Sequence, residues 1–411
     1  MDLKSLKAKL FLTGLVLLTI LFISGGFVMA VDRADITIVT EIASHGQVVT
    51  ALVLEYSDTL DPAHLSTDLY EVKANRVNED GGELLGRTIT AVYTNNEPSI
   101  ALEANPGRYV IIELDADDIN APTLYYKETA IGGFNFNYEI EYIISQKNNI
   151  KTKDGTIIPA GVILGNKRKN LIVDEFQNFI YQDETREEMP YSLYIPANYD
   201  PDISYPLVLF LHGAGERGFN NQVHLKANMG AIVWAEDKVQ SKYSAFVLAP
   251  QAPQNSGWTQ FISIEDLYNP TKHLEMAYDL LHEIINAYNI DEDRLYSTGL
   301  SMGGFGTWAI NIANPDTFAA MVPICGGGDP DKAHLLVNKA IWNFHAEDDA
   351  TVPVELSRNI VNSLKELGSD IRYTEYESGF VSPPLALMPH FSWIPAYNNS
   401  EMIEWLFSQS K

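Results

Sequence analysis

Residues 294–303 read RLYSTGLSMG, and Ser301 is flanked by glycines two positions away on each side. The first five letters predict a strand, and the letters FGTWAIN at 305–311 predict a helix that ends near Asn314. A serine on such a tight strand-to-helix turn has strained backbone angles and holds its hydroxyl clear of the sheet. The glycines allow close backbone approach, because no Cβ stands in the way. We therefore interpret the segment as a turn that presents a reactive hydroxyl.

The sequence around this turn alternates between strands and helices from about residue 151 onward. Residues 207–211 (LVLFL) form a continuous apolar run, which is typical of a strand buried on both faces. Residues 273–288 place apolar side chains at helical spacing, and 402–407 close the chain as a helix. Such alternation predicts a mostly parallel sheet with helices on both faces. The other expected strands are 157–164, 171–181, 245–248, 294–298, 320–325, 340–344 and 371–376.

Residues from about 35 to about 146 have a different pattern, in which short β-rich runs are separated by turn residues. Several short strands at this spacing predict a β-sandwich of immunoglobulin type, without the two cysteines of antibody domains. The expected strands are 36–42, 48–56, 69–77, 88–93, 109–114 and 134–144. We therefore expect an all-β immunoglobulin-like domain at 31–150 and an α/β domain at 151–411.

The first thirty residues carry the pattern of an export signal. Three lysines precede an apolar stretch at 10–23, and small residues lead up to Ala30. This predicts a signal peptide at 1–30 and a secreted or periplasmic protein. The alternative is an uncleaved N-terminal anchor, because the apolar stretch is long for a signal.

Composition excludes several classes of partner. The 411-residue chain has a formal net charge of −26, which repels phosphate backbones and anionic lipid headgroups. We therefore expect no nucleic-acid binding and, once the signal is cleaved, no membrane binding. Cys325 is the single cysteine and lies in an apolar run, so we expect a buried free thiol. Neither metal-ligand spacing nor a phosphate-binding loop is found, and we expect no metal and no cofactor.

Three histidines follow Ser301 and are candidates for the base that a serine nucleophile needs. In α/β-hydrolases the acid and then the base follow the serine along the chain. His390 lies in a loop between the last strand and the last helix, where this fold places its base, and we predict that role for it. His334 is expected at an exposed helical position. His345 ends a strand and is expected to hold the acidic loop that follows.

This acidic loop, Glu347, Asp348 and Asp349, supplies the candidate acid. A carboxylate here can hold the imidazole tautomer and stabilise the imidazolium formed during proton transfer. The carboxylates that do not take this role are expected to be solvated or to cap the helix that starts near Pro353.

An oxyanion formed by attack on a carbonyl needs preorganised N–H donors. One is expected at Met302, directly after the serine. The second is expected in the glycine-rich run 212–218 that follows the strand 207–211, where Ala214 is our choice and Gly215 is the alternative.

Three further residues near these loops are candidates for contact with the substrate. For Glu216 and Arg217 a local ion pair is favoured over contact with polar substrate groups. Trp258 lies in a loop on the same side of the sheet and is predicted to line the substrate pocket, with a loop-anchoring role as the equal alternative.

With these residues in view, the chain from about 171 to 411 resembles the α/β-hydrolase esterases of the carboxylesterase and predicted-peptidase group. The mature chain as a whole is similar to secreted bacterial esterases with an N-terminal immunoglobulin-like domain. The family pattern H-G-x-x-D-x-x-V-P, aligned with 345–353, selects Asp349 as the acid and leaves Asp348 as the alternative. Ala346 replaces the glycine of that pattern, and the loop 382–387 is unusually apolar. The shared runs are 212–218, 299–304, 324–328, 345–353 and 390–393.

The resemblance implies an esterase that prefers short acyl chains. Together with the residues above, it predicts a secreted serine carboxylesterase that acts on small-molecule esters through Ser301, His390 and Asp349. One alternative is a peptidase with the same triad. The other is a polysaccharide-binding protein whose hydrolase half is secondary. The sequence leaves the natural ester and the oligomeric state open.

Overall fold

The computed structural model describes residues 35–60, 65–165, 167–260 and 266–411. The expected signal peptide at 1–30 therefore lies outside the described residues. The chain divides into two compact units that are interleaved in sequence, so the division does not coincide with a single boundary near residue 150. Among the described residues, the first unit consists of 35–39, Thr50–Ala121 and Glu139–Arg168, and the second of Thr40–Val49, Pro122–Tyr138 and Lys169–Lys411.

The first unit is built of strands in two main sheets. Five strands pair in the order β13-β1-β2-β6-β5, and four pair in the order β12-β9-β3-β4. Burial alternates along β3, where Tyr70, Val72 and Ala74 are buried and Glu71 and Lys73 are exposed, as in a strand with one face on a core. This is the expected immunoglobulin-like sandwich. Three of its strands, β1, β2 and β13, continue into the second unit. The strands are β1 (Asp35–Ala43), β2 (Gly46–Leu60), β3 (Tyr70–Asn78), β4 (Gly81–Arg87), β5 (Ile89–Asn95), β6 (Gly107–Leu114), β9 (Glu139–Gln146), β12 (Gly161–Gly165) and β13 (Lys167–Asn170). The short strands β10 (Ile150–Lys151) and β11 (Ile157–Ile158) pair with each other, and η2 (Thr67–Leu69) is a single turn.

The single strand predicted at 134–144 is two strands in the structure. β8 (Gly132–Asn137) pairs antiparallel with β7 (Leu124–Thr129) in a hairpin of the second unit, whereas β9 belongs to the first unit. The N–H of Tyr138, between β8 and β9, donates to the carbonyl of Thr123 at 2.9 Å and closes the base of the hairpin. Within the second unit, β8 contacts residues 214–216, which lie in the glycine-rich run after the strand predicted at 207–211.

An eight-stranded sheet forms the centre of the second unit, in the order β14-β15-β17-β16-β18-β19-β20-β21. The pairs β14/β15 and β15/β17 are antiparallel, and every pair from β17 to β21 is parallel. This is the mostly parallel sheet that the alternating sequence predicts. The strands are β14 (Phe176–Gln182), β15 (Glu188–Tyr194), β16 (Tyr205–Leu211), β17 (Phe246–Pro250), β18 (Ile290–Leu300), β19 (Ala320–Ile324), β20 (Ala340–Ala346) and β21 (Arg372–Tyr376).

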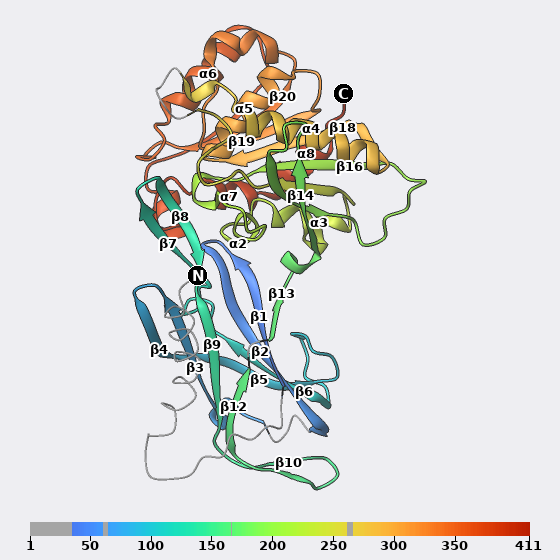
Figure 1. The fold of residues 1–411 in the computed structure, drawn as a ribbon, viewed down its shortest axis with the longest axis vertical. Coiled ribbons are helices and arrows are strands. Elements are labelled where there is room, and N and C mark those ends of the chain that lie inside the picture. The colour runs from blue at the N-terminus through green and yellow to red at the C-terminus, as the bar shows by residue number, and fades with distance from the viewer. Residues whose placement is uncertain (1–34, 61–64, 166, 261–265) are drawn as a thin grey trace. The chain divides into compact units, whose positions relative to one another are not determined.

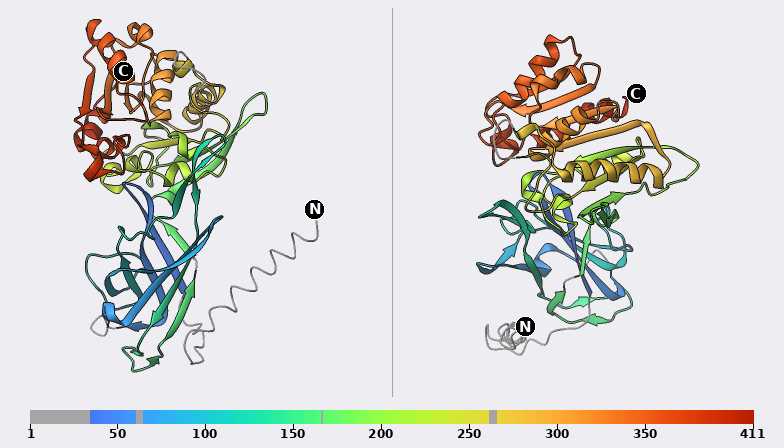
Figure 2. Two further views of the ribbon diagram at one scale, coloured as in Figure 1. Left: turned by 90° about the vertical axis from the view of Figure 1, so that its left-hand side faces the viewer. Right: turned by 45° about the horizontal axis from the view of Figure 1, so that its top comes forward.

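The side chains of β16 alternate between two hydrophobic cores, one on each face of the sheet. Val208 and Phe210 pack with the buried side chains of η5, α7 and α8, whereas Leu207, Leu209 and Leu211 pack with those of α4. Helices accordingly lie on both sides of the sheet (Figures 1 and 2), as in an α/β-hydrolase. The helices are α2 (Val223–Lys226), α3 (Asp237–Gln240), α4 (Lys272–Ala287), α5 (Met302–Ala313), α6 (Glu355–Glu366), α7 (Trp393–Tyr397) and α8 (Ser400–Phe407), with the shorter turns η3 (Val173–Glu175), η4 (Ala214–Glu216), η5 (Ile232–Ala235), η6 (Asp266–Tyr268), η7 (Pro330–Leu336) and η8 (Val381–Leu385).

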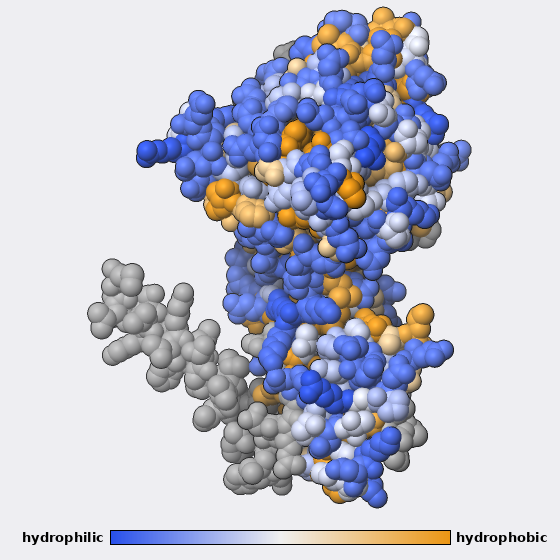
Figure 3. Space-filling model, turned by 90° about the vertical axis from the view of Figure 1, so that its right-hand side faces the viewer, coloured by the Kyte–Doolittle hydropathy of each residue, from blue (hydrophilic) through white to orange (hydrophobic). Residues whose placement is uncertain are grey.

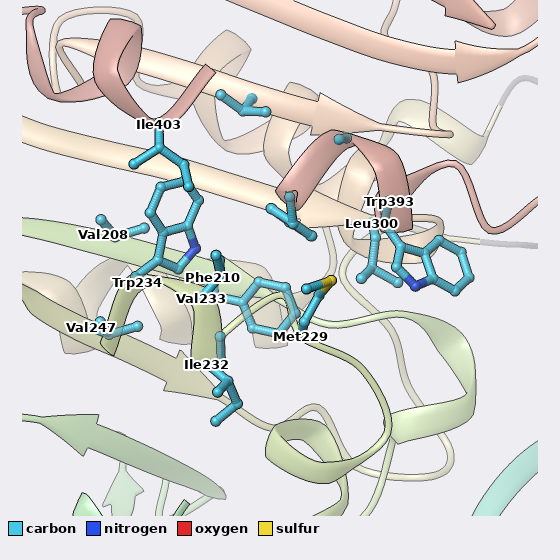
Figure 4. Close-up of a cluster of buried hydrophobic side chains, with 14 of the residues drawn as sticks. Val208, Phe210, Met229, Ile232, Val233, Trp234, Val247, Leu300, Trp393 and Ile403 are labelled. Atoms are coloured by element: carbon cyan, nitrogen blue, oxygen red, sulfur yellow. The ribbon is translucent and has the colours of Figure 1, made fainter. Parts of the chain in front are cut away.

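One of the two cores also holds the residues next to the predicted nucleophile and base (Figure 4). Leu300 directly precedes Ser301, and Trp393 follows His390 by three residues; both side chains are buried in the cluster around Phe210. Burial of one large apolar side chain contributes about 1.5–3 kcal/mol. The core therefore fixes the segments of the predicted nucleophile and the predicted base against each other.

The strand predicted at 171–181 begins later than expected. Ile172 has a φ of 64°, a backbone conformation that bulky residues seldom adopt, and η3 follows it before β14 starts at Phe176.

The surface is mainly hydrophilic with small apolar patches on the face shown in Figure 3. Within the described part of the chain, no helix is long and apolar enough to cross a membrane.

Candidate active site

Ser301 stands at the turn between β18 and α5, as the sequence predicts. Its backbone is at φ 53° and ψ −119°, a conformation that costs a residue with a side chain about 1–3 kcal/mol. The turn is tight because α5 starts directly against the end of β16. A Cβ on Gly303 would lie 1.8 Å from the carbonyl oxygen of Leu211, so only glycine fits there. The packing of α5 on β16 thus enforces the strained turn that presents the serine.

His390 reaches this serine from the loop before α7. Its Nε2 lies 2.9 Å from Ser301 Oγ, and its side chain is almost fully buried. The ring is held edge-on against Trp393, with centroids 5.5 Å apart. The distance is within the reach that proton transfer between a hydroxyl and a base requires.

Asp349 faces the other side of the His390 ring. Its Oδ2 lies 2.7 Å from His390 Nδ1, and its Oδ1 accepts the backbone N–H groups of Thr351 and Val352 at 2.8 and 2.9 Å. Burial alone would raise the pKa of this carboxyl, but hydrogen bonds from His345, His390 and the Val352 N–H outweigh it and hold the pKa well below its usual range. Asp349 is therefore ionised at neutral pH and able to orient the His390 ring.

The remaining acidic residues of the loop have other contacts. Asp348 Oδ2 accepts the N–H of Gly379 at 2.9 Å, and Glu347 Oε2 accepts the hydroxyl of Ser378 at 3.0 Å. These carboxylates hold the turn after β21. Of the three candidates from the sequence, the structure brings only Asp349 to the histidine.

The other two histidines after Ser301 do not contact it. His334 is exposed in η7, as expected. His345 is fully buried at the end of β20, and its Nε2 lies 2.9 Å from Val352 O and 3.2 Å from Asp349 Oδ2. It thus holds the acidic loop, as the sequence predicts, but it also contacts Asp349, the carboxylate beside His390, and the sequence does not reveal this contact.

The two predicted oxyanion donors begin neighbouring turns. Met302 is the first residue of α5 and Ala214 the first of η4, so neither N–H has an acceptor within its own helix. The loops approach each other closely, because a Cβ on Gly213 would lie 2.8 Å from Leu300 Cδ1. Two N–H groups at the starts of adjacent turns are suited to bind an oxyanion beside Ser301.

A buried network behind η4 supports this loop. Trp258 is fully buried and its Nε1–H donates to the carbonyl of His212 at 2.9 Å, so the structure gives it the anchoring role that was the alternative to substrate contact. His212 Nδ1 lies 2.7 Å from the carbonyl of Gly213, and burial lowers the pKa of this histidine to about 3. A neutral His212 can then donate from Nδ1 and accept the Ala252 N–H at Nε2, 3.0 Å away.

The ion pair expected between Glu216 and Arg217 does not form. Arg217 donates to the carbonyls of Ala214 and Gln254 at 2.8 and 3.1 Å, and its guanidinium lies over the ring of Phe134, 4.7 Å from the centroid. Glu216 is buried instead. Burial raises its pKa to about 7, and the Gly213 N–H and the charge of Arg217 oppose this only in part.

Asn135 is a contact of this loop that the sequence does not indicate. It lies on β8, and its Nδ2 is 3.3 Å from Gly215 O and 3.4 Å from Glu216 Oε1. The hairpin thus contacts two of the three residues of η4, the turn that begins with the predicted oxyanion donor Ala214. No motif marks Asn135, because its partners lie about eighty positions away in the chain.

Cys325 is a buried free thiol, as predicted. The N–H of Ser301 lies 3.3 Å from its Sγ, and burial raises the pKa of the thiol well above its usual value. The thiol therefore supports the turn in its neutral form. Across the described residues, no group of three or more His, Cys, Asp or Glu side chains could hold a metal ion.

Comparisons with known proteins place relatives on both parts of the chain. The sequence family described as the esterase Ig-like N-terminal domain matches residues 35–159. A solved structure described as a thermostable esterase is 42% identical, covers 93% of this chain and 100% of its own, and has a TM-score of 0.87. No curated protein matches the chain.

More distant solved structures are also esterases. A CE1 ferulic acid esterase from Anaeromyces mucronatus is 16% identical, covers 54% of this chain and 88% of its own, and has a TM-score of 0.38. Esterase 2 of Thermogutta terrifontis, phosphorylated by paraoxon, is 12% identical, covers 57% and 96%, and has a TM-score of 0.39. At these TM-scores, neither structure bears on the site described above.

Proposed function

Because the chain belongs to the esterases that carry an immunoglobulin-like N-terminal domain, we propose that Ser301, His390 and Asp349 are the catalytic triad with which it hydrolyses short-chain acyl esters outside the cytoplasm. The protein is a serine hydrolase of the carboxylesterase class. The observation that carries the triad is one continuous line of hydrogen bonds. It runs from Ser301 Oγ to His390 Nε2 at 2.9 Å, and from His390 Nδ1 to Asp349 Oδ2 at 2.7 Å.

The reaction follows from this line. His390 Nε2 takes the proton of Ser301 as Oγ attacks the ester carbonyl, and the N–H groups of Met302 and Ala214 bind the oxyanion that forms. The imidazolium then gives its proton to the departing alkoxide, which leaves as the alcohol. Water, deprotonated by His390, attacks the acyl-enzyme, and the imidazolium returns that proton to Ser301 Oγ as the bond between Oγ and the acyl carbon breaks and the carboxylic acid is released. Asp349, ionised throughout, keeps the Nδ1 proton in place.

The apolar segment before His390 supports a substrate with an apolar group. Phe380, Leu385, Leu387 and Met388 all expose large parts of their side chains along the segment that leads to the base. The apolar acyl or alcohol group of an ester can pack against such a surface, and a short acyl chain requires only a small apolar contact area. The preference for short chains otherwise rests on the family resemblance.

Hydrolysis of p-nitrophenyl esters tests the triad and the preference together. Wild type should turn over acetate and butyrate faster than laurate, and Ser301→Ala and His390→Ala should each lose at least about a thousandfold in kcat. Equal rates for wild type and Ser301→Ala would remove Ser301 from the mechanism. Matched p-nitroanilides test the peptidase alternative, which predicts amide cleavage at rates comparable with the esters.

Export is tested on the native host protein. The basic and apolar pattern of residues 1–30 supports cleavage after Ala30, so N-terminal sequencing of the enzyme outside the cytoplasm should begin at Val31. An intact N-terminus on a membrane-bound enzyme would instead establish the anchor alternative.

A further inference from the structure

The carboxylate of Asp349 has more donors than a triad requires. Its Oδ1 accepts two backbone N–H groups, and its Oδ2 lies within hydrogen-bond distance of both His390 Nδ1, at 2.7 Å, and His345 Nε2, at 3.2 Å. A carboxylate has about four lone-pair positions, so all of them are used. Two imidazole rings therefore converge on the one oxygen atom that faces the proposed base.

The surroundings of His345 decide which of its nitrogens carries a proton. Nε2 lies 2.9 Å from the carbonyl oxygen of Val352, and that oxygen can only accept a hydrogen bond. Nε2 must therefore be an N–H donor, shared between Val352 O and Asp349 Oδ2. This holds whether or not the second nitrogen, Nδ1, is also protonated.

The ring of His345 is also prevented from turning. Its Nδ1 lies 2.8 Å from Ser357 Oγ on α6, and that hydroxyl is in turn 2.9 Å from Gly326 O. The imidazole is fully buried at the end of β20. Contacts at both nitrogens thus aim Nε2–H at the catalytic carboxylate, and water does not compete for it.

Charged groups around this ring come from three elements. Asp349 lies in its own loop, and Glu375 is its register partner on β21. Arg358 of α6 lies 2.5 Å from Glu375 Oε1 and lowers the pKa of that carboxyl, so Glu375 is already paired. Asp349 is then the carboxylate toward which the Nε2–H of His345 is directed.

We propose that His345 is a positioning residue of the catalytic triad, whose Nε2–H shares the Asp349 oxygen that His390 uses, and so fixes the direction of that oxygen and dilutes its negative charge. The proposal rests on the triad proposed above. His345, the histidine of the H-A-E-D-D run, thereby helps to set the basicity of His390.

Loss of the shared donor has two consequences. The carboxylate gains freedom to turn, so His390 is less often aimed at Ser301, and kcat falls. The negative charge also acts undivided on the imidazolium of His390, which stays protonated to higher pH. A residue with a merely structural role would lower stability without this second effect.

The experiment compares His345→Leu, His345→Gln and the exposed control His334→Leu by kcat, KM and the pH profile of kcat/KM on p-nitrophenyl butyrate. We expect His345→Leu to lose about ten- to a hundredfold in kcat with KM within about twofold. Its acid limb should move up by about half a pH unit or more. His345→Gln keeps an N–H donor and should recover much of both effects, while His334→Leu should match wild type.

A double-mutant cycle shows whether His345 acts through Asp349. In an Asp349→Ala background, His345→Leu should cost less than about twofold in kcat, because its target is gone. The proposal is overturned if His345→Leu lowers kcat as much in the Asp349→Ala background as in wild type. It is also overturned if folded His345→Leu has the same acid limb of kcat/KM as wild type. Should His345→Leu fail to fold, Ser357→Ala frees the ring and must move the acid limb in the same direction, and no movement overturns it equally.

Ser301→Ala, measured alongside, separates this proposal from the function it rests on. Retained activity in Ser301→Ala means that the triad itself is wrong. An inactive Ser301→Ala together with a His345→Leu that matches His334→Leu means that only the role of His345 is wrong.

Discussion

Replacement of Glu216 by glutamine should stabilise the second unit, compared with wild type at the same pH, more at alkaline pH than at acid pH. Glu216 is buried in η4, and this burial raises its pKa from the ordinary 4.5 to about 7. Between these pH values the folded protein keeps a proton that the unfolded chain has lost. The free energy of unfolding therefore falls as pH rises through this window, and it levels off above pH 7.

The size of the effect follows from the two pKa values. Each pH unit between them corresponds to about 1.4 kcal/mol, so the wild type should lose about 3 kcal/mol between pH 4 and pH 8 through Glu216. Glutamine cannot titrate. The difference in unfolding free energy between Glu216→Gln and wild type should therefore shift by about 3 kcal/mol in favour of the variant over this range.

Urea unfolding followed by tryptophan fluorescence measures this difference. All six tryptophans lie between residues 234 and 405, within the second unit, so the signal reports on the unit that contains Glu216. The exposed Glu275→Gln on α4 is the matched control and should follow wild type at every pH. Parallel curves for Glu216→Gln and wild type between pH 4 and pH 8 would refute the reasoning, because they would mean that Glu216 has the same pKa in both states.

Two further predictions concern the oxyanion loop and the serine turn. Asn135→Ala removes the side-chain donor to Gly215 O and Glu216 Oε1 and should lower kcat by about three- to tenfold with KM little changed. The control Asn137→Ala, at an exposed position of the same strand, should keep wild-type kinetics. Equal kinetics for the two variants would contradict a role of the hairpin in holding the loop. Gly303→Ala places a Cβ 1.8 Å from Leu211 O, so α5 must move away from β16. The kcat should therefore fall by at least about a hundredfold, as it does when an oxyanion donor is lost. A wild-type kcat in a folded Gly303→Ala would contradict this, because it would show that the turn tolerates the shift.

The sequence predicts the central strands β16 and β17 well, because each is a continuous apolar run, whereas the strand β15, which contains polar residues, is not predicted from the sequence. Residues 207–211 lie within β16, and the helix predicted at 273–288 is α4 to within one residue at each end. The strand expected at 171–181 fails at Ile172, whose left-handed backbone depends on surrounding structure and not on its own preference. The break at Tyr138 is hidden for a similar reason, because the strand pattern continues across it.

The proposed triad residues can be found from the sequence because chain order restricts the choice. Only three histidines follow Ser301, and one acidic loop directly follows the strand that ends near His345. The structure brings His390 to the serine and Asp349 to His390. Asn135 cannot be found in this way, because its contact with η4 depends on how the β7–β8 hairpin packs within the second unit. The second contact of His345 is hidden too, since it arises from the way the loop 347–352 curls back over the ring.

The central claim, that Ser301 is the nucleophile of a triad with His390 and Asp349, is tested most directly by covalent labelling. A fluorophosphonate should add once per chain, and tandem mass spectrometry should find it on Ser301 in the tryptic peptide 295–332. Labelling should be abolished in Ser301→Ala and slowed by at least about a hundredfold in His390→Ala. A stoichiometric adduct on another residue, or equal labelling of wild type and Ser301→Ala, would contradict the account.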